Sequence, residues 1–383
     1  MMPMEAFYYR TLLVYALVNI YLFWHFWLLA RRRKLFLVTL PLFACMAFFP
    51  LVHLHLPEDG LLQAAAAHLA QAWLPVAFFC LPVFGIYDVF RILRGMAHRF
   101  FPNHSFRFLA YPYIVSAMLL LGAAVYSYGL IEARTLTVHH LEIATKKLPL
   151  ETKRLRIVFA SDLHISPHTG NTMLQRTVDA ILAEKPDIIL LGGDILDDSR
   201  QGTGKDKREL ERLAAPLGVF GVLGNHDAFG DADRAAGFLR HAGITMLASE
   251  LRKAGPLTLV GIEDPVAAQQ MPQPRPELGG LLRQASPERY TILLDHRPFV
   301  RPETIGYFDF QLSGHSHGGQ IPLLWPHVRS TYGVGAGLSQ HAGEDGESLL
   351  FMTTGTGFSK LPIRLLTPPE IVVIDLVNRR QAQ

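Results

Sequence analysis

Four long apolar runs in the first third of the chain constrain its fold more strongly than any other feature. The first, at 11–30 (TLLVYALVNIYLFWHFWLLA), has 20 residues, enough for a helix to cross about 30 Å of hydrocarbon. The others lie at about 35–54, 73–90 and 108–130, and nearly all charged residues of this third lie outside the runs. We therefore predict an all-α transmembrane region of about four spans over residues 1–134.

Two other interpretations of these runs are weaker. A cleavable signal peptide has a shorter apolar segment and a small-residue cleavage site, whereas the first run is followed by four cations at 31–34. Buried helices of a soluble all-α domain are disfavoured because charged hinges separate the runs. Cys45 and Cys80 both lie in apolar runs, so a disulfide framework is not expected.

The basic residues between the runs predict an orientation. Four cations at 31–34 follow the first run and four arginines at 91–107 follow the third, whereas the loop at 55–60 (HLPEDG) has two acids and no Lys or Arg. Because cytoplasmic loops are enriched in Lys and Arg, everything after Arg134 is expected outside the cytoplasm. Asp88 lies three residues before Arg91, which favours a local ion pair or a snorkelling site over a transport path through the membrane.

The pattern changes after a polar connector at 135–154. Short continuous apolar runs then alternate with amphipathic segments, which is typical of a layered α/β domain and which we assign to 155–383. A helix is expected after Asn171, with others at 205–215 and 231–241, and the proline-rich stretch 263–287 is expected to be an exposed loop. The predicted strands are 157–160, 188–191, 218–223, 257–262, 290–294, 308–312, 349–353 and 371–377.

Five small clusters of polar residues follow five of these strands, where α/β sheets gather ligands. They are Asp162-Leu163-His164, Gly192-Gly193-Asp194, Gly224-Asn225-His226-Asp227, His296 and Gly314-His315-Ser316-His317-Gly318. In extended backbone, residues i and i+2 project to the same side, so Asp162 with His164, and His315 with His317, are expected to present two ligands each toward one site. Oxygen and imidazole ligands without thiolate suit Mn, Fe, Zn, Ni or Co. The candidates exceed the need of one open site, which takes about three protein ligands, so we expect two ions bridged by a carboxylate.

The five clusters, in this order over about 155–320, resemble the pattern of the calcineurin-like metallophosphoesterases. The continuation HGGQIPL and the C-terminal RLLTPPEIVVIDL resemble the membrane-associated bacterial subgroup of that family. The resemblance implies a four-layer α-β-β-α sandwich and a bacterial inner membrane location, and the basic loops predict that the catalytic domain faces outward. It also implies that Asp162, His164 and His317 hold a first metal, that Asp194 bridges both metals, and that Asn225, His296 and His315 complete the second.

The same resemblance assigns roles in catalysis. Attack by metal-bridged hydroxide is expected, with His226 facing the substrate as a charge stabiliser or general acid and Asp227 orienting it. Taken singly, Asp162 or Asp194 also fits a helix N-cap. Arg297, Lys360 and Arg364 are either phosphate clamps or solvated surface cations, and Asp295 either orients His296 or faces solvent.

These observations predict a membrane-anchored, dinuclear metal-dependent phosphoesterase acting on a phosphodiester, pyrophosphate or phosphomonoester bond. Four spans exceed what a freely diffusing substrate requires, which favours a phospholipid or a lipid-linked pyrophosphate at the membrane surface. The net charge of +3 gives no support for a nucleic-acid partner. Two alternatives remain, a non-catalytic binding scaffold and a regulatory domain of a membrane transporter or sensor.

Overall fold

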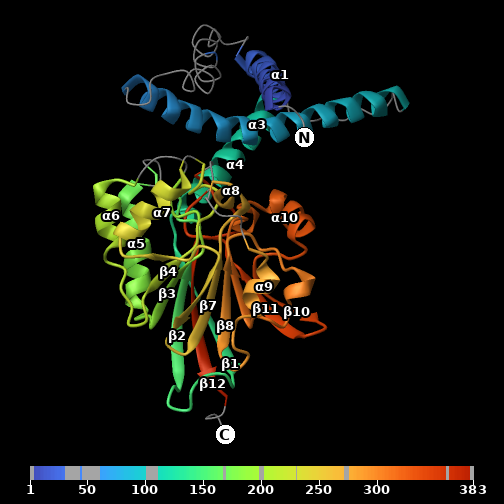
Figure 1. Cartoon of the computed structure of the whole chain (residues 1–383). Coiled ribbons are helices and arrows are strands. Elements are labelled where there is room, and N and C mark those ends of the chain that lie inside the picture. The colour runs from blue at the N-terminus through green and yellow to red at the C-terminus, as the bar shows by residue number, and fades with distance from the viewer. Residues whose placement is uncertain are drawn as a thin grey trace. The chain divides into compact units, whose positions relative to one another are not determined.

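The structure is a computed structural model, and its elements are shown in Figure 1. It describes residues 4–30, 44, 61–100, 111–166, 170–197, 202–229, 231–270, 276–358 and 362–379. The chain divides into two compact units, Met1–Tyr128 and Gly129–Gln383. Each unit is considered by itself.

The first unit is helical in the part that the structure describes. Its helices are α1 (Met4–Ala30), α3 (Leu61–Phe100) and most of α4 (Tyr111–Glu132). They coincide with the first, third and fourth predicted apolar runs, whereas the second run lies outside the described residues apart from Ala44. Among the described helices, none combines the length and the apolar character needed to cross a membrane. The four-span region stays a prediction.

Helices α1 and α3 pack through a small apolar cluster that includes Leu22, Trp73 and Phe84. The predicted local pair is present, with 3.6 Å between Arg91 Nε and Asp88 Oδ1. Asp88 has a second partner on α1, because its Oδ2 lies 3.0 Å from Nε2 of the buried His25. The sequence did not indicate this contact, since the two residues are far apart in the chain.

The second unit contains two six-stranded sheets. In spatial order, the first consists of β1 (Thr137–Thr145), β12 (Glu370–Asn378), β2 (Arg154–Ala160), β3 (Ile188–Leu191), β4 (Val219–Gly221) and β5 (Thr245–Met246). The second consists of β10 (Gly337–Gly343), β11 (Gly346–Met352), β9 (Phe310–Ser313), β8 (Tyr290–Asp295), β7 (Leu257–Ile262) and β6 (Glu250–Ala254). Strands β2 to β5 are parallel to one another, as are β7, β8, β9 and β11, so within each set the carboxyl ends lie at one edge.

Three apolar clusters explain why helices and sheets form layers. On one face of the first sheet, Val158 packs with residues of α5 (Gly170–Ala183), α6 (Gly204–Leu210) and α7 (Ala232–His241). On its other face, Phe159 packs against Ile292 and Phe310 of the second sheet. Leu293 then packs against α9 (Leu278–Leu282) on the far side. Because both faces of these central strands are buried, their sequences are continuously apolar, and the predicted mixed α/β fold is confirmed.

Several elements differ from the sequence-based expectation. Strand β1 lies within the expected connector and pairs with β12. The exposed-loop prediction for 263–287 is wrong where α8 (Pro265–Ala268) and α9 lie, since Ala267 and Leu281 are buried. Side-chain caps explain both helices, because Asp264 accepts from the Val266 amide and Glu277 accepts from two amides of α9. Helix α10 (Trp325–Tyr332) and three 3-10 turns, Pro302–Thr304, His317–Gly319 and Pro322–Leu324, were also not predicted.

Candidate metal centre

The five polar clusters come together because they follow five parallel strands at the carboxyl edges of the two sheets. Six of the seven predicted metal ligands form two groups in which the ligand atoms lie within 4.8 Å of one another. The first group is Asp162, His164 and His317, and the second is Asp194, His296 and His315. Apart from Asn225, these are the residues that the family resemblance implied for the two metals.

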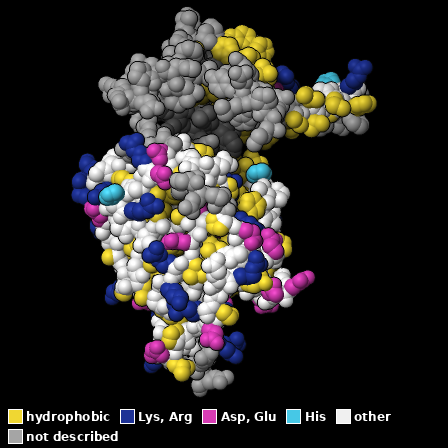
Figure 2. All heavy atoms as spheres, viewed as in Figure 1, with side chains coloured by type: hydrophobic (Ala, Val, Ile, Leu, Met, Phe, Trp, Pro, Cys, Tyr) yellow, Lys and Arg dark blue, Asp and Glu magenta, His cyan; other side chains and the backbone are white. Residues whose placement is uncertain are grey.

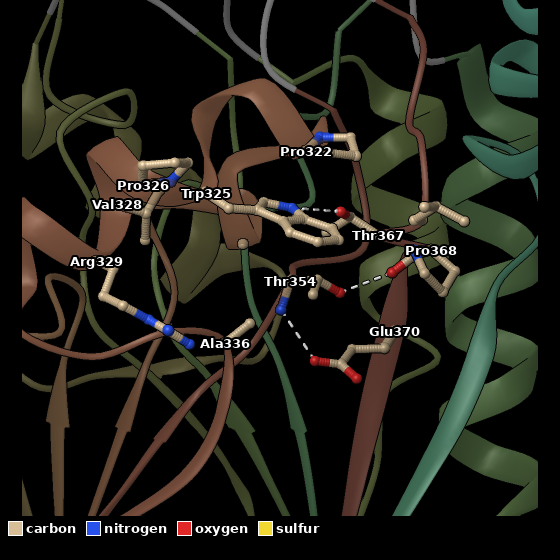
Figure 3. A pocket seen from close by; sticks show the side chains of 13 residues that line it. Pro322, Trp325, Pro326, Val328, Arg329, Ala336, Thr354, Thr367, Pro368 and Glu370 are labelled. Atoms are coloured by element: carbon tan, nitrogen blue, oxygen red, sulfur yellow. Dashed lines mark hydrogen bonds between the residues drawn. The ribbon is translucent and has the colours of Figure 1, made fainter.

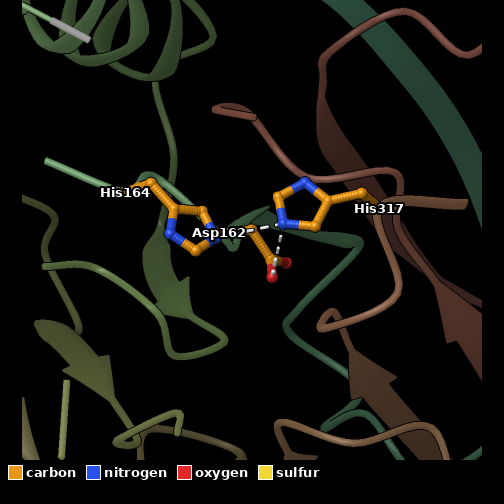
Figure 4. A group of neighbouring side chains, drawn as sticks. All are labelled: Asp162, His164 and His317. Carbon is orange, nitrogen blue, oxygen red and sulfur yellow. Dashed lines mark hydrogen bonds and ion pairs between the residues drawn. The ribbon is translucent and has the colours of Figure 1, made fainter. Parts of the chain in front are cut away.

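The first group is buried, and Figure 4 shows the side chains of Asp162 and His164, which follow β2, together with that of His317, which follows β9. His164 Nε2 lies 3.0 Å from His317 Nε2, and His317 Nε2 lies 3.7 Å from Asp162 Oδ1. Ligands bound about 2.1 Å from one ion are separated by about 3.0–3.4 Å in octahedral or tetrahedral arrangements. The spacing of the two histidines lies in this range, and the Asp162 oxygen is slightly farther from His317. Burial raises the pKa of Asp162, and the Asp194 charge adds to that rise.

The second group has comparable spacings. His315 Nδ1 lies 3.2 Å from His296 Nε2, which in turn lies 3.1 Å from Asp194 Oδ2. The same Asp194 oxygen is 3.9 Å from His164 Nε2, which puts this carboxylate between the two groups. Burial alone would lower the pKa of His296, but the adjacent Asp194 carboxylate raises it to about 10. Without a cation, His296 and Asp194 therefore form a buried ion pair.

Asn225 supports the fit of this site to metal. Its side-chain oxygen Oδ1 is buried and has no hydrogen-bond partner among the residues that the structure describes. A buried acceptor is rarely left unpaired, because its lost hydration costs about 1–3 kcal/mol. A divalent cation is a partner that would satisfy such an oxygen. Together with the imidazole and carboxylate groups, it forms a donor set that suits first-row divalent metals.

In two of the candidate ligand histidines, the ring nitrogen that points away from the group, Nδ1, contacts a hydrogen-bond acceptor. His296 Nδ1 lies 2.8 Å from the Gly192 carbonyl oxygen, and His164 Nδ1 lies 3.2 Å from Asp197 Oδ1. Such contacts fix the imidazole orientation and leave the opposite nitrogen for a metal. The ring of His317 is instead contacted from behind, with 3.1 Å between its Nδ1 and Arg364 Nη2.

The sequence-based expectation that residues i and i+2 project to the same side assumed extended backbone, and the backbone at these residues is not extended. Asp162 and His164 nevertheless belong to one group. Five of the proposed ligands have positive φ angles: Asp162 at 56°, His164 at 46°, Asp194 at 50°, His315 at 69° and His317 at 49°. The turns send His315 and His317 to different groups instead of presenting them side by side. Each such residue costs on the order of 1–3 kcal/mol and persists only where its surroundings hold it.

Hydrogen bonds and close-packed glycines hold these strained turns. The Asp162 and Asp194 carboxylates accept from the amides of His315 and His226 at 2.9 and 2.8 Å. A Cβ atom at Gly224 would lie 2.1 Å from Asp194 Oδ1, and one at Gly314 would lie 2.1 Å from Asp162 Oδ2. The two motif glycines are therefore required because the carboxylates pass directly over their backbone.

The half-buried His226 lies beside the first group but has a different partner from the one expected. Its Nδ1 is 2.9 Å from Asp197 Oδ1, a residue that the sequence reasoning missed. Bonds from His164 and His226 hold the pKa of Asp197 well below its usual range, although burial alone would raise it. The Asp227 carboxylate instead accepts from the backbone amides of Leu196 and Gly224, both at 2.8 Å. Its position three residues after Asp194, in the same loop, was the sequence signal that could have identified Asp197 as a site residue.

Two of the remaining candidates, Arg364 and Arg297, have structural partners. Arg364 is completely buried and donates to the carbonyl oxygens of Thr367 and Gly357, both at 3.0 Å, so neither a solvated nor a substrate-clamping role fits. Arg297 Nη2 donates to Asp264 Oδ1 at 3.1 Å. Asp295 is buried and does not face solvent as one interpretation had it. Lys360 lies outside the described residues.

Comparisons with known proteins agree with this geometry. The family model described as calcineurin-like phosphoesterase matches residues 155–319. An uncharacterized metallophosphoesterase of Aquifex aeolicus is 31% identical over 263 residues, which cover 68% of this chain and 98% of that protein. One from Campylobacter jejuni is 24% identical over 97% of this chain and 98% of its own length. A transmembrane protein with metallophosphoesterase domain from Danio rerio is 28% identical over 79% of this chain and 74% of its own length.

The sequence, the paired ligand groups and the match to nearly the whole Aquifex protein lead to one assignment. The chain belongs to the calcineurin-like metallophosphoesterase family and is a metal-dependent phosphoesterase.

Proposed function

We propose that this protein hydrolyses a phosphate ester with two divalent cations held side by side. Asp162, His164 and His317 hold the first cation, Asn225, His296 and His315 the second, and Asp194 bridges them. The observation that carries the proposal is the position of Asp194, whose Oδ2 lies within 4 Å of a histidine from each group. When bound, the cations supply the Lewis acidity that activates water and neutralises phosphoryl charge.

The protein's own groups position and protonate the substrate. His226 is the proton donor to the leaving oxygen through Nε2, because its Nδ1 is held 2.9 Å from the Asp197 carboxylate. Asp197 also contacts His164, so one carboxylate oxygen orients both the proton donor and a metal ligand. Asp227, the predicted partner of His226, supports the site by tying the turn at Gly224 to the chain at Leu196.

Membrane attachment is part of the proposal. Residues 1–134 anchor the protein, 135–154 connect, and 155–383 form the catalytic domain on the outer side of a bacterial inner membrane. The support comes from the apolar runs, the basic loops and the name of the Danio rerio relative. The proposed substrate is a phospholipid or a lipid-linked pyrophosphate. On the face of the second unit seen in Figure 2, basic and acidic side chains are interspersed.

Hydrolysis of chromogenic phosphate esters by the purified full-length protein tests this function. The wild type with Mn²⁺ is expected to hydrolyse a p-nitrophenyl diester or monoester, and Asp194→Asn is expected to lose at least about 100-fold because it removes the bridging charge. Asp179→Asn, which changes an exposed carboxylate, serves as the matched control. Two bound metals without hydrolysis of any ester would instead favour the binding-scaffold alternative.

A further inference from the structure

A cavity of about 600 Å³ lies against helix α10 in the second unit, and no role in the proposed chemistry accounts for it. Its volume falls in the range of about 300–1,000 Å³ that is typical of small-molecule sites. Most of the side chains around it are apolar, and Figure 3 shows them surrounding the indole of Trp325. They include Pro322, Trp325, Pro326, Val328, Leu366 and Pro368.

The cavity adjoins the metal centre. Gly318, which forms part of its wall, directly follows the metal ligand His317. At the other end of α10, the Tyr332 ring lies 6.1 Å from the His315 ring, measured between centroids. Arg329 lines the cavity and lies one helical turn before Tyr332, because residues three apart on a helix share a face.

Hydrogen bonds fix the cavity wall in place. Glu132, at the end of α4, accepts from the backbone amides of Leu366 and Thr367 at 2.9 and 3.1 Å. Trp325 Nε1 donates to Thr367 Oγ1 at 3.2 Å, as the dashed line in Figure 3 marks. The indole is thereby held with its apolar faces available, so the cavity is a preformed feature of the second unit.

The charges of the cavity indicate what kind of molecule fits. Among the residues that the structure describes, the guanidinium of Arg329 has no hydrogen-bond or ion-pair partner. The nearby Glu370 carboxylate is engaged, because its Oε1 accepts from Thr353 Oγ1 and the Thr354 amide at 2.9 Å. Leu323, which lies at the surface two residues before Trp325, is 72% exposed. Leu366, which lines the cavity, is 66% exposed. An available cation beside apolar surface suits an anionic amphiphile.

We propose that this cavity holds the alkyl chain of an amphipathic phosphoester substrate, and that Arg329 pairs with its phosphoryl oxygens at the metal centre. The proposal rests on the proposed function, which it deepens by giving the apolar part of the substrate a location. The alkyl chain of the substrate is expected to enter the cavity past Leu323 and Leu366 and to lie against Trp325 and Val328.

Occupancy of the cavity can be measured without catalysis. In a full-length Cys45→Ala, Cys80→Ala background, Ala336→Cys places a thiol in the cavity wall, and Ser330→Cys places one on exposed α10 surface as the control. Octyl phosphate is expected to slow maleimide labelling at position 336 at least about fivefold and to leave the control unchanged. Inorganic phosphate at the same concentration should protect neither thiol. Equal labelling with and without octyl phosphate would overturn the proposal, whether or not the protein is active.

Kinetic measurements then distinguish the contribution of the substrate's alkyl chain from that of the Arg329 charge. For p-nitrophenyl alkyl phosphodiesters, wild-type kcat/KM is expected to rise at least about tenfold from the ethyl to the octyl ester, because each added methylene removes more apolar surface from water. Ala336→Phe, which adds an aromatic ring to the cavity wall, should flatten this series to within about twofold. Arg329→Gln should lower the rates of all esters about tenfold, with partial recovery in Arg329→Lys. If kcat/KM of Ala336→Phe rose with ester chain length as steeply as that of the wild type, the alkyl chain would bind elsewhere. If the protein hydrolysed no ester but octyl phosphate still protected position 336, only the proposed function would be refuted.

Discussion

Replacing Asp197 by Asn tests whether one carboxylate controls the proton donor. The substitution keeps the shape of the side chain but removes its charge, and the amide oxygen can still accept from an imidazole. Because Asp197 Oδ1 lies 2.9 Å from His226 Nδ1 and 3.2 Å from His164 Nδ1, both rings lose the same charged partner. We expect a large loss of turnover with a small change in stability.

The magnitude follows from the distance. A full imidazolium charge 2.9 Å from a carboxylate oxygen gains about 6 kcal/mol at an effective dielectric constant of about 20. Asp197 is 27% exposed, so solvent screens the pair, and only part of the charge on His226 changes during the reaction. About 2–4 kcal/mol remains, which corresponds to a loss of about 30- to 1,000-fold in kcat.

The assay compares kcat and thermal stability of Asp197→Asn with those of Asp227→Asn. The Asp227 carboxylate accepts from two buried amides, so its substitution should lower stability by about 1–3 kcal/mol and reduce kcat less. Both proteins are assayed at saturating Mn²⁺, and bound metal is counted to exclude loss of a cation. A kcat for Asp197→Asn within about threefold of wild type, with Asp227→Asn far less active, would refute the assignment and restore Asp227 as the orienting carboxylate.

Four further predictions concern the metal ligands and their support. Asp194 raises the pKa of His296 to about 10, although burial opposes the rise, so a cation that binds Nε2 must displace a proton. Metal uptake between about pH 7 and 9 should therefore release about one proton per chain. Calorimetry in buffers of different ionisation enthalpy measures this release, and identical heats of metal binding in all buffers would contradict it. Since that pKa is raised above the unfolded value of about 6.5, the ion pair stabilises the metal-free protein fully below about pH 6.5, and this contribution should disappear as the pH rises through about 10. Gly224→Ala places a Cβ 2.1 Å from Asp194 Oδ1 and should weaken metal binding about 10- to 100-fold by metal titration, whereas Gly237→Ala, which meets no atom within 4 Å, should not. Arg364→Met leaves buried carbonyls without donors and should lower the free energy of unfolding by about 3–5 kcal/mol in denaturant titrations, and a loss below about 1 kcal/mol would count against the buried network.

Sequence reasoning succeeded where burial dictates composition. Central strands such as β3 and β8 are buried on both faces, so their continuous apolar runs identified them almost to the residue. Strand β10 was missed because it lies at a sheet edge and its side chains are only partly buried or exposed. Helix α10 was missed because only Val328 along it is buried, which leaves no apolar stripe to detect.

The same division applies to the site. Order and spacing of the polar clusters predicted which side chains lie together, because parallel strands bring their carboxyl ends to one edge of the sheet. The separation of His315 from His317 could not be predicted from spacing, since it depends on left-handed turns that hydrogen bonds to Asp162 hold in place. Asp197 was missed because its role depends on two histidines from other loops, and the cavity depends on residues spread over 318–370.

Electron paramagnetic resonance of the Mn²⁺-loaded protein tests whether Asp194 bridges two adjacent cations. We predict about two Mn²⁺ per chain with the multiline spectrum of a spin-coupled pair, and loss of that coupling in Asp194→Asn. A single Mn²⁺ per chain, or two ions that give only the six-line spectrum of isolated Mn²⁺, would contradict the account.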